Sequence, residues 1–360
     1  MATARLLLLY IVTTAWLSFA LAIVPLKHFF PHGTSMRDKK LERGDDTSSE
    51  EFQLKMPFHF FGQAYHSLWV NVNGAISFAS PIATFTPECG PVNREFSAIG
   101  PYWADVDIRE TGNIYYRQSK RKSDLKKARR EIEDAFPDIE RLKLKWALIV
   151  TCDDSMPRNF EDFDKKRCHE CNNRKRNTFQ LVITTDGKRS YAIFYYNKLE
   201  WTTGEASGGE LGLGGIPARA GFDLGDGKHY TMIPGSCNGD VLKINHKSNV
   251  GSPGKWIFRV DEANIRSAGC SKQNESGEQV LKACKPAKKK LKKKLKKVLK
   301  KIVKKQKKVA KKIKKILKKQ EEPKMESTTT EATATTAAEV QRMSIDQLIP
   351  KNWWIKKKTK

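Results

Sequence analysis

Short runs of apolar and β-branched residues, separated by turn residues, dominate the chain from about residue 52 to residue 260. We expect strands over these runs, which cover residues 67–72, 75–78, 144–150, 178–184, 191–196 and 257–260. Asn73-Gly74 joins the first pair of runs, and Asp186-Gly187 joins a later pair. Both dipeptides favour a type I′ hairpin turn, which needs positive φ at two positions. The pattern therefore predicts a mainly β fold, an antiparallel sandwich-like architecture.

One segment of this region has helical spacing instead. Apolar residues recur at intervals of three and four at Leu125, Ala128, Ile132 and Phe136. Ser123 is the expected N-cap, and Pro137 ends the pattern. Lysines and arginines occupy the opposite face, so we expect a surface helix over about 123–136 that flanks the sheets.

Residues 285–319 carry a second helical pattern. On a helix of about 100° per residue, their aliphatic side chains fall within an arc of roughly 140°. These residues are Leu291, Leu295, Val298, Leu299, Ile302, Val303, Val309, Ile313, Ile316 and Leu317. Nearly all the lysines lie outside this arc: Lys288, Lys289, Lys290, Lys292, Lys293, Lys294, Lys296, Lys297, Lys300, Lys301, Lys304, Lys305, Lys307, Lys308, Lys311, Lys312, Lys314, Lys315, Lys318 and Lys319.

This angular sorting predicts a cationic amphipathic helix rather than a solvated run of charge, which would show no periodicity. A coiled coil is disfavoured, because the repeat averages about 3.6 residues and like charges would face each other. Neighbouring lysines repel, so we expect the free segment to be mostly unfolded and to become helical when anions neutralise it.

The charge of the chain is concentrated in this tail. The formal net charge of the 360 residues is +27, of which residues 285–319 carry +21 and residues 320–360 carry +1. The remaining residues carry only +5. The chain is thus a nearly balanced globular part followed by a polycation, which excludes a uniformly basic, histone-like protein. It also argues against an enzyme built in one piece, because the tail cannot form a pocket.

The N-terminus has the features of a secretory signal. Arg5 precedes an apolar run over residues 6–24, and Ala20-Leu21-Ala22 supplies the small residues of a cleavage site. We expect a signal peptide over residues 1–22, with an uncleaved signal anchor as the alternative. The predicted localisation is secreted and extracellular.

Seven cysteines suit an oxidising compartment: Cys89, Cys152, Cys168, Cys171, Cys237, Cys270 and Cys284. An odd number predicts one thiol that is free or joined to another chain by an intermolecular disulfide. Two arrangements are open: Cys270 with Cys284 would close a small loop before the tail, and Cys152 with Cys168 or Cys171 would staple a basic insertion. Asn274 begins the one N-x-S/T sequon, a predicted N-glycosylation site.

Catalytic and metal-binding motifs are weak. Cys168-His169-Glu170-Cys171 resembles half a zinc site, but no second pair completes it, so we expect no metal. The glycines over residues 208–227 form neither a dinucleotide-binding nor a Walker loop, and G-x-S-x-G and H-E-x-x-H are absent. Asp105 and Asp107 would lie on one face of a strand, either as calcium ligands or as structural carboxylates; we favour the structural role. No cofactor and no enzymatic activity are predicted.

An ordered series of segments resembles the NIDO domain of nidogen, alpha-tectorin and related extracellular proteins over about residues 28–262. The segments that carry the resemblance are residues 30–33, the acidic Asp45-Asp46, and residues 57–62, 68–78, 98–107, 112–117, 177–187, 220–223, 234–236, 248–251 and 254–260. The resemblance implies an extracellular, non-enzymatic module of matrix and cell-surface proteins. The chain departs from the family by a basic insertion over residues 157–176 and by a lysine-rich tail where further modules usually follow.

These features divide the chain into a signal peptide (1–22), a NIDO-like domain (23–262), a Cys-containing linker (263–284), the lysine-rich helix (285–319) and a Ser/Thr-rich spacer with a basic, Trp-containing end (320–360). We expect a secreted matrix or cell-adhesion protein whose domain contacts matrix proteins or glycans. Its tail would bind anionic polysaccharides such as heparin, or anionic membrane surfaces, and not nucleic acid. The alternative is a secreted defence or toxin protein whose tail permeabilises membranes.

Overall fold

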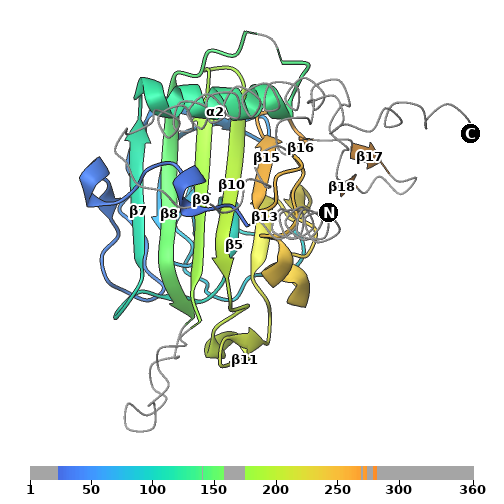
Figure 1. Ribbon diagram of the computed structural model, residues 1–360. Coiled ribbons are helices and arrows are strands. Elements are labelled where there is room, and N and C mark those ends of the chain that lie inside the picture. The colour runs from blue at the N-terminus through green and yellow to red at the C-terminus, as the bar shows by residue number, and fades with distance from the viewer. Residues whose placement is uncertain (1–22, 140, 158–174, 269–270, 274–278, 282–360) are drawn as a thin grey trace, which may run out of the picture. The chain divides into compact units, whose positions relative to one another are not determined.

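The computed structural model describes residues 23–139, 141–157, 175–268, 271–273 and 279–281. These residues form two antiparallel sheets with one α-helix against the larger sheet (Figure 1), so the predicted mainly β architecture is confirmed. The short 3₁₀ helices are η1 (Leu26–His28), η2 (Thr34–Met36), η4 (Glu205–Ser207) and η5 (Gly239–Lys243).

The larger sheet has eight strands in the order β1-β7-β8-β9-β10-β15-β16, with β6 paired to β8. Its strands are β1 (Lys39–Lys40), β6 (Val106–Asp107), β7 (Asn113–Ser119), β8 (Trp146–Pro157), β9 (Asn177–Thr185), β10 (Ser190–Leu199), β15 (Lys255–Arg259) and β16 (Arg266–Ser267). All the described residues of β9 are buried. This strand reads as a continuous apolar run because both faces of the sheet are covered.

The smaller sheet has six strands in the order β14-β13-β5-β4-β3-β2. Its strands are β2 (Phe52–Phe60), β3 (Gln63–Asn71), β4 (Ala75–Phe78), β5 (Ser97–Trp103), β13 (Arg219–Asp223) and β14 (Tyr230–Met232). Two short hairpins stand apart from both sheets: β11 (Gly209–Glu210) with β12 (Leu213–Gly214), and β17 (Ser271–Gln273) with β18 (Gln279–Leu281).

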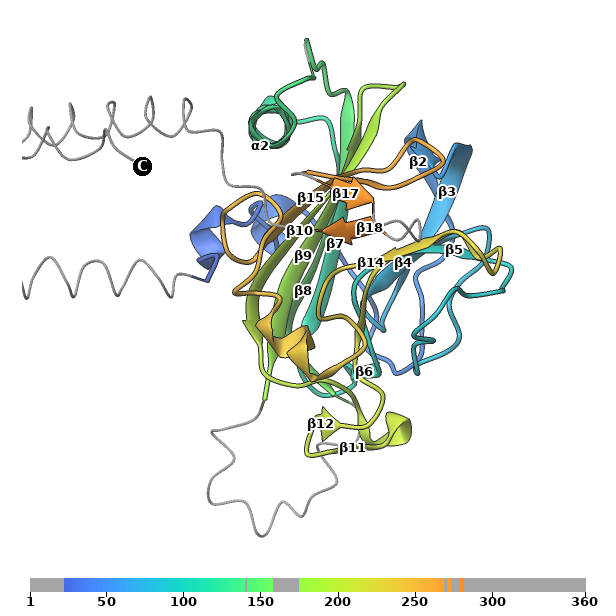
Figure 2. The ribbon, with the colours of Figure 1, turned by 90° about the vertical axis from the view of Figure 1, so that its right-hand side faces the viewer.

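Two apolar cores hold these layers together. The first lies between the sheets, where Phe222 of the smaller sheet stacks on Phe194 of the larger one with ring centroids 5.3 Å apart. The second lies on the opposite face of the larger sheet, where Val182 belongs to the same buried cluster as Ile132 of the helix. Figure 2 shows the resulting order, with the helix on one side of the larger sheet and the smaller sheet on the other.

The helix α2 spans Lys122–Ala135, close to its predicted bounds. Its predicted cap is wrong: the N-cap is Arg121, whose side chain makes no capping hydrogen bond, and Ser123 lies inside the first turn. Asp124 anchors this end instead, because its buried carboxylate accepts hydrogen bonds from Ser119 Oγ (2.7 Å) and Arg117 Nη2 (3.2 Å). A carboxylate in the first turn is also favoured by the helix dipole.

The N-terminal segment of the described chain packs on the same face as α2. Val24 and Phe30 are buried in the second core. Gln180, buried on β9, binds the backbone of Phe30 on both sides: Phe30 N donates to its Oε1 (2.7 Å) and its Nε2 donates to Phe30 O (2.9 Å). Residues from Val24 onward are therefore an integral part of the fold.

Both predicted hairpins form, but with longer loops. Asn71 pairs with Ala75, so three residues form the first loop, and only Gly74 has positive φ (77°). Thr185 pairs with Ser190, so the second loop has four residues, of which only Gly187 has positive φ (95°). The type I′ expectation is therefore wrong at both sites. At Gly74 a second constraint operates, because a Cβ would lie 2.1 Å from the carbonyl oxygen of Tyr102.

Candidate functional site

Asp105 and Asp107 do not act as a pair, contrary to the sequence-based expectation of a shared strand face. Asp105 follows the end of β5 and is fully buried, whereas Asp107 ends β6. Asp107 Oδ2 forms an ion pair with Arg109 Nη2 at 2.5 Å. The chain bends between β5 and β6, so the strand periodicity on which the expectation rested does not extend across both residues.

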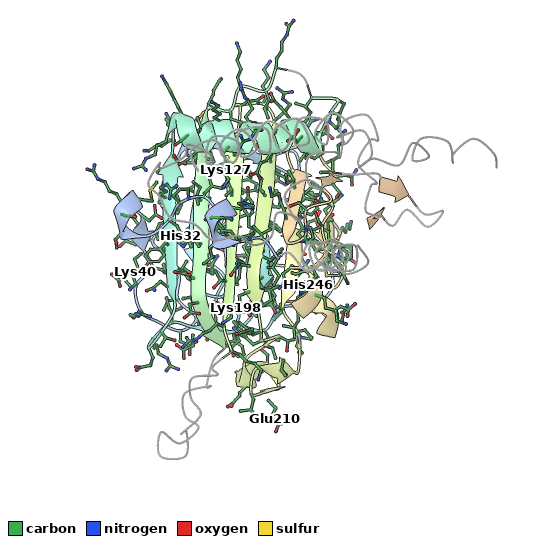
Figure 3. All side chains as sticks on the ribbon, in the orientation of Figure 1. His32, Lys40, Lys127, Lys198, Glu210 and His246 are labelled. Carbon is green, nitrogen blue, oxygen red and sulfur yellow. A yellow bond between two sulfur atoms is a disulfide. The ribbon has the colours of Figure 1, made fainter. Side chains whose placement is uncertain are left out.

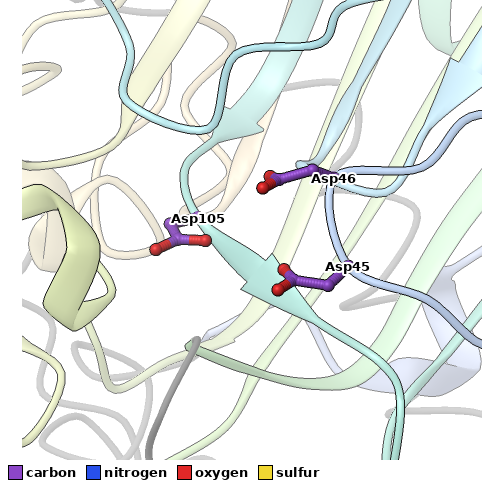
Figure 4. Close-up of side chains that lie close together, drawn as sticks. All are labelled: Asp45, Asp46 and Asp105. Atoms are coloured by element: carbon purple, nitrogen blue, oxygen red, sulfur yellow. The ribbon is translucent and has the colours of Figure 1, made fainter.

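Asp105 instead lies beside two acids from a loop distant in sequence. One carboxylate oxygen each from Asp45, Asp46 and Asp105 lies within 4.8 Å of the other two. Figure 4 shows the three side chains converging from the loop that holds Asp45 and Asp46 and from the connection that holds Asp105. An isolated bridge between Asp45 and Asp107 fixes the loop against the larger sheet.

The first hairpin turn positions this acidic cluster. Asn73 Nδ2 donates to Asp46 Oδ1 (2.8 Å), and Asn73 Oδ1 accepts from the backbone N of Val106 (2.8 Å). One amide side chain therefore connects the loop to the β5–β6 connection. Arg109 adds positive charge nearby, 3.7 Å from Asp45 Oδ2.

Carboxylate oxygens are the ligands that Ca²⁺ prefers, at about six to eight oxygens per ion. Three carboxylates supply at most six, and one side of the cluster is closed by backbone: a Cβ on Gly204 would lie 2.5 Å from Asp105 Oδ2. Arg109 and Asn73 account for contacts to Asp45 and Asp46 without an ion. We therefore interpret the cluster as a structural junction, and the absence of a cofactor remains a prediction.

The cysteines divide into three groups. Cys89 and Cys237 form a disulfide with a Cα–Cα distance of 5.6 Å, which joins the segment before β5 to the segment after β14. Cys152 is a free, buried thiol on β8, opposite Ile114 of β7 and Phe179 of β9. The other four, Cys168, Cys171, Cys270 and Cys284, lie outside the described residues.

The position of Cys152 corrects one expectation. It does not staple the basic insertion to the domain, because it is a core residue with 3% exposure. The same burial keeps Cys152 from another chain, and an intermolecular disulfide from one of the four cysteines outside the described residues stays a prediction. Burial raises the pKa of the Cys152 thiol far above its usual range, which keeps it protonated and unreactive.

Several predicted features lie outside the described residues: the signal peptide (1–22), most of the basic insertion (158–174), the glycosylation site Asn274, the lysine-rich helix (285–319) and the spacer (320–360). Within the described residues, no helix is both long and apolar enough to span a membrane.

The fold is a two-sheet antiparallel β domain closed by a disulfide, a combination typical of proteins that work outside the cell. The profile of the nidogen-like domain matches residues 66–262. The chain therefore belongs to the nidogen-like domain family.

Individual relatives agree with this assignment. The chain is 35% identical to alpha-tectorin of Homo sapiens over 268 residues, covering 72% of this chain and 12% of the relative. It is 30% identical to nidogen of Drosophila melanogaster, covering 62% of this chain and 16% of the relative. The chain thus corresponds to a small part of these much longer proteins. No solved structure gives a significant match.

Proposed function

We propose that this protein is a secreted matrix or cell-adhesion protein with two binding parts. The nidogen-like domain serves as a non-catalytic interaction module, and the lysine-rich tail binds anionic polysaccharides or anionic membrane surfaces. Family membership is the observation that carries the proposal for the domain: its nidogen and alpha-tectorin relatives are extracellular matrix proteins.

The buried ion pairs of the domain support a role in binding rather than catalysis. Two buried arginines of the domain are engaged in ion pairs that hold segments together. Arg117 joins Asp38 (2.8 Å) and Asp124 (3.2 Å), and Arg219 binds Asp223. Such paired groups serve the fold, because burying a charge is costly unless it is paired and hydrogen-bonded.

The proposal for the tail is carried by its charge, since residues 285–319 contain 21 lysines and no acid. A polycation attracts polyanions by releasing their condensed counterions. It also attracts an anionic bilayer, where each lysine near the surface contributes on the order of 1 kcal/mol. The secretory signal favours extracellular polysaccharides and membranes as targets over nucleic acids.

A defence or toxin protein is the second candidate function. The observation that favours it is the sorting of aliphatic residues to one face of the predicted tail helix, which is the pattern of helices that insert into bilayer interfaces. Leakage of dye from anionic vesicles would distinguish this function from polysaccharide binding.

Deleting residues 285–360 tests whether the domain folds without the tail and whether the tail is the part that binds heparin. Residues up to Leu281 include every strand that the structure describes, so we expect the shortened protein to keep a cooperative thermal transition. We expect it to lose retention on heparin at physiological salt, because the deletion removes +22 of the formal net charge of +27. The matched control lacks only residues 320–360, which carry +1, and should be retained like the full chain. Full retention of the shortened protein would refute the role of the tail.

A further inference from the structure

A cleft of about 480 Å³ lies at one side of the domain, between the edges of the two sheets. Its residues come from the segment that crosses from β1 to β2 and from β7. They are Lys39, Lys40, Leu41, Glu42, Arg43, Thr47, Ser48, Ser49, Glu50, Glu51, Phe52 and Tyr116. In Figure 3, Lys40 marks its position at the β1 edge of the larger sheet, away from α2. The volume falls in the range of small-molecule sites, about 300–1,000 Å³.

Backbone hydrogen bonds hold the two walls of the cleft on different sheets. The first wall follows β7, where Leu41 N donates to Ile114 O (2.9 Å). Arg43 Nη1 reinforces this wall by donating to the carbonyl oxygen of Ile108 (2.7 Å). The second wall follows β3, where Ser49 N donates to Val70 O (2.8 Å). Because each wall is anchored to a separate sheet, the cleft is formed before any ligand arrives.

An aromatic pair contributes the apolar surface of the cleft. Phe52 and Tyr116 stack with ring centroids 5.7 Å apart and an angle of 29° between their planes. Both side chains are half-buried. Burial raises the pKa of Tyr116, and the carboxylates of Glu50 and Glu42 raise it further. The phenol of Tyr116 therefore stays protonated, and the negative charges of Glu50 and Glu42 act on it.

The charged residues of the cleft balance each other. Three are basic (Lys39, Lys40 and Arg43) and three are acidic (Glu42, Glu50 and Glu51). An anionic polymer would gain nothing overall from this set, because attraction to the bases is offset by repulsion from the acids. The hydroxyls of Thr47 and Tyr116 add groups that both donate and accept hydrogen bonds, whereas the hydroxyls of Ser48 and Ser49 already donate to Asn71 Oδ1 (2.7 Å) and Glu50 O (2.9 Å).

We propose that this cleft binds a neutral sugar ring of an extracellular glycan, with the ring against Tyr116 and Phe52. A sugar presents C–H groups on its faces and hydroxyls around its rim. The C–H faces match the aromatic pair, and the hydroxyls match the mixed donors and acceptors of the two walls. This inference rests on the extracellular placement in the proposed function, but it concerns a different part of the chain from the tail.

The test uses the full chain and neutral tetrasaccharides of N-acetylglucosamine, mannose or galactose, with binding measured by saturation-transfer NMR and calorimetry. Because these probes carry no charge, the tail cannot bind them through counterion release. Tyr116→Leu keeps an apolar side chain but removes the aromatic face. The matched control is Tyr115→Leu, because Tyr115 is the half-buried neighbour that points to the opposite face of β7.

We expect at least one tetrasaccharide to bind, with its affinity reduced about tenfold or more by Tyr116→Leu and less than about twofold by Tyr115→Leu. Glu50→Gln, which removes one carboxylate from the cleft, should weaken binding without changing which of the three sugars binds best. Binding should change little with salt, unlike that of heparin.

The proposal is overturned if no neutral tetrasaccharide binds the folded chain at millimolar concentration, or if the two tyrosine variants bind equally well. Binding of an extended peptide in the cleft, without sugar binding, would also overturn it. Retention on heparin is measured in parallel, so failure of the cleft proposal is distinguishable from failure of the role proposed for the tail.

Discussion

The affinity of the full chain for heparin is expected to fall by about three to five powers of ten between about 50 mM and 200 mM salt. Residues 285–319 carry 21 lysines, and engagement of half of them would release about ten counterions. In a plot of the logarithm of the binding constant against the logarithm of the salt concentration, each engaged lysine then contributes a slope of about −0.9. This is the value established for proteins that bind DNA. Calorimetry or surface plasmon resonance over a series of salt concentrations measures this slope.

Removing charge in pairs provides the control. Replacing Lys300 and Lys301 with glutamine should make the slope shallower by about 2 and weaken binding at low salt. The same replacement at Lys120, just before α2, and Lys122, the first residue of α2, should leave the slope unchanged. A slope near zero for the full chain would show that heparin is not recognised through the tail.

The double variant Cys89→Ser with Cys237→Ser is expected to lose about 4–5 kcal/mol of unfolding free energy. The disulfide joins residues separated by 148 positions, so its removal restores a large loop entropy to the unfolded chain. It would also release the segment around Cys89 from the segment after β14. Urea unfolding monitored by tryptophan fluorescence measures the change.

The m-value, which is the dependence of the unfolding free energy on denaturant concentration, distinguishes an effect of the disulfide on the unfolded chain from a simple loss of packing. Without the cross-link the unfolded chain expands, so the m-value should rise as the midpoint falls. Cys152→Ala is the control, because it removes a buried thiol that is not cross-linked. It should cost about 1 kcal/mol and leave the m-value unchanged. An unaltered midpoint in the double serine variant would contradict the stabilising role of the disulfide.

Local sequence patterns predicted six strands and the helix of the domain, but missed β2, β5, β7 and β13. Alternating and continuous apolar runs located β3, β4, β8, β9, β10 and β15, and the helical spacing located α2. The details failed where tertiary contacts outweighed local preference. Ser123 has good capping chemistry, yet the helix begins earlier because Arg117 and Ser119 of β7 fix Asp124 from outside the helix.

The turns show the same limit. Asn73-Gly74 is the strongest short-range signal for a two-residue loop, but the side chain of Asn73 is used to tie Asp46 to Val106. The loop accordingly lengthens to three residues, and only Gly74 adopts positive φ. Local propensity cannot reveal a contact with a segment more than twenty residues away.

The sequence drew attention to Asp45, Asp46 and Asp105 separately, but it could not predict that they meet, nor could it predict the cleft. Asp45 and Asp105 are far apart in the chain and meet only because the loop after β1 crosses from one sheet to the other. Cys152 looked like any other cysteine, although its place between apolar positions of a strand could have indicated a core residue. The tail is the opposite case, because its pattern is entirely local.

We proposed the tail as the binding effector of this protein, and the double variant Ile302→Lys with Ile313→Lys is the sharpest test of that role. This change adds charge and destroys the apolar face of the predicted helix. The matched control, Lys301→Ile with Lys312→Ile, removes charge and places aliphatic residues on the lysine face. Both are measured in the full chain, by heparin affinity and by leakage of dye from anionic vesicles.

For a tail that recognises polysaccharide, heparin affinity should hold or rise in Ile302→Lys with Ile313→Lys and fall in the control. For a tail that recognises membranes, the first variant should abolish leakage, because each buried methylene contributes about 0.8 kcal/mol and two isoleucines are lost from the apolar face. Whichever target is correct, either heparin affinity or vesicle leakage should change strongly between the variants, and that activity should depend on salt. If heparin affinity and leakage are both indifferent to the two variants and to salt, the tail is not the effector and the account is wrong.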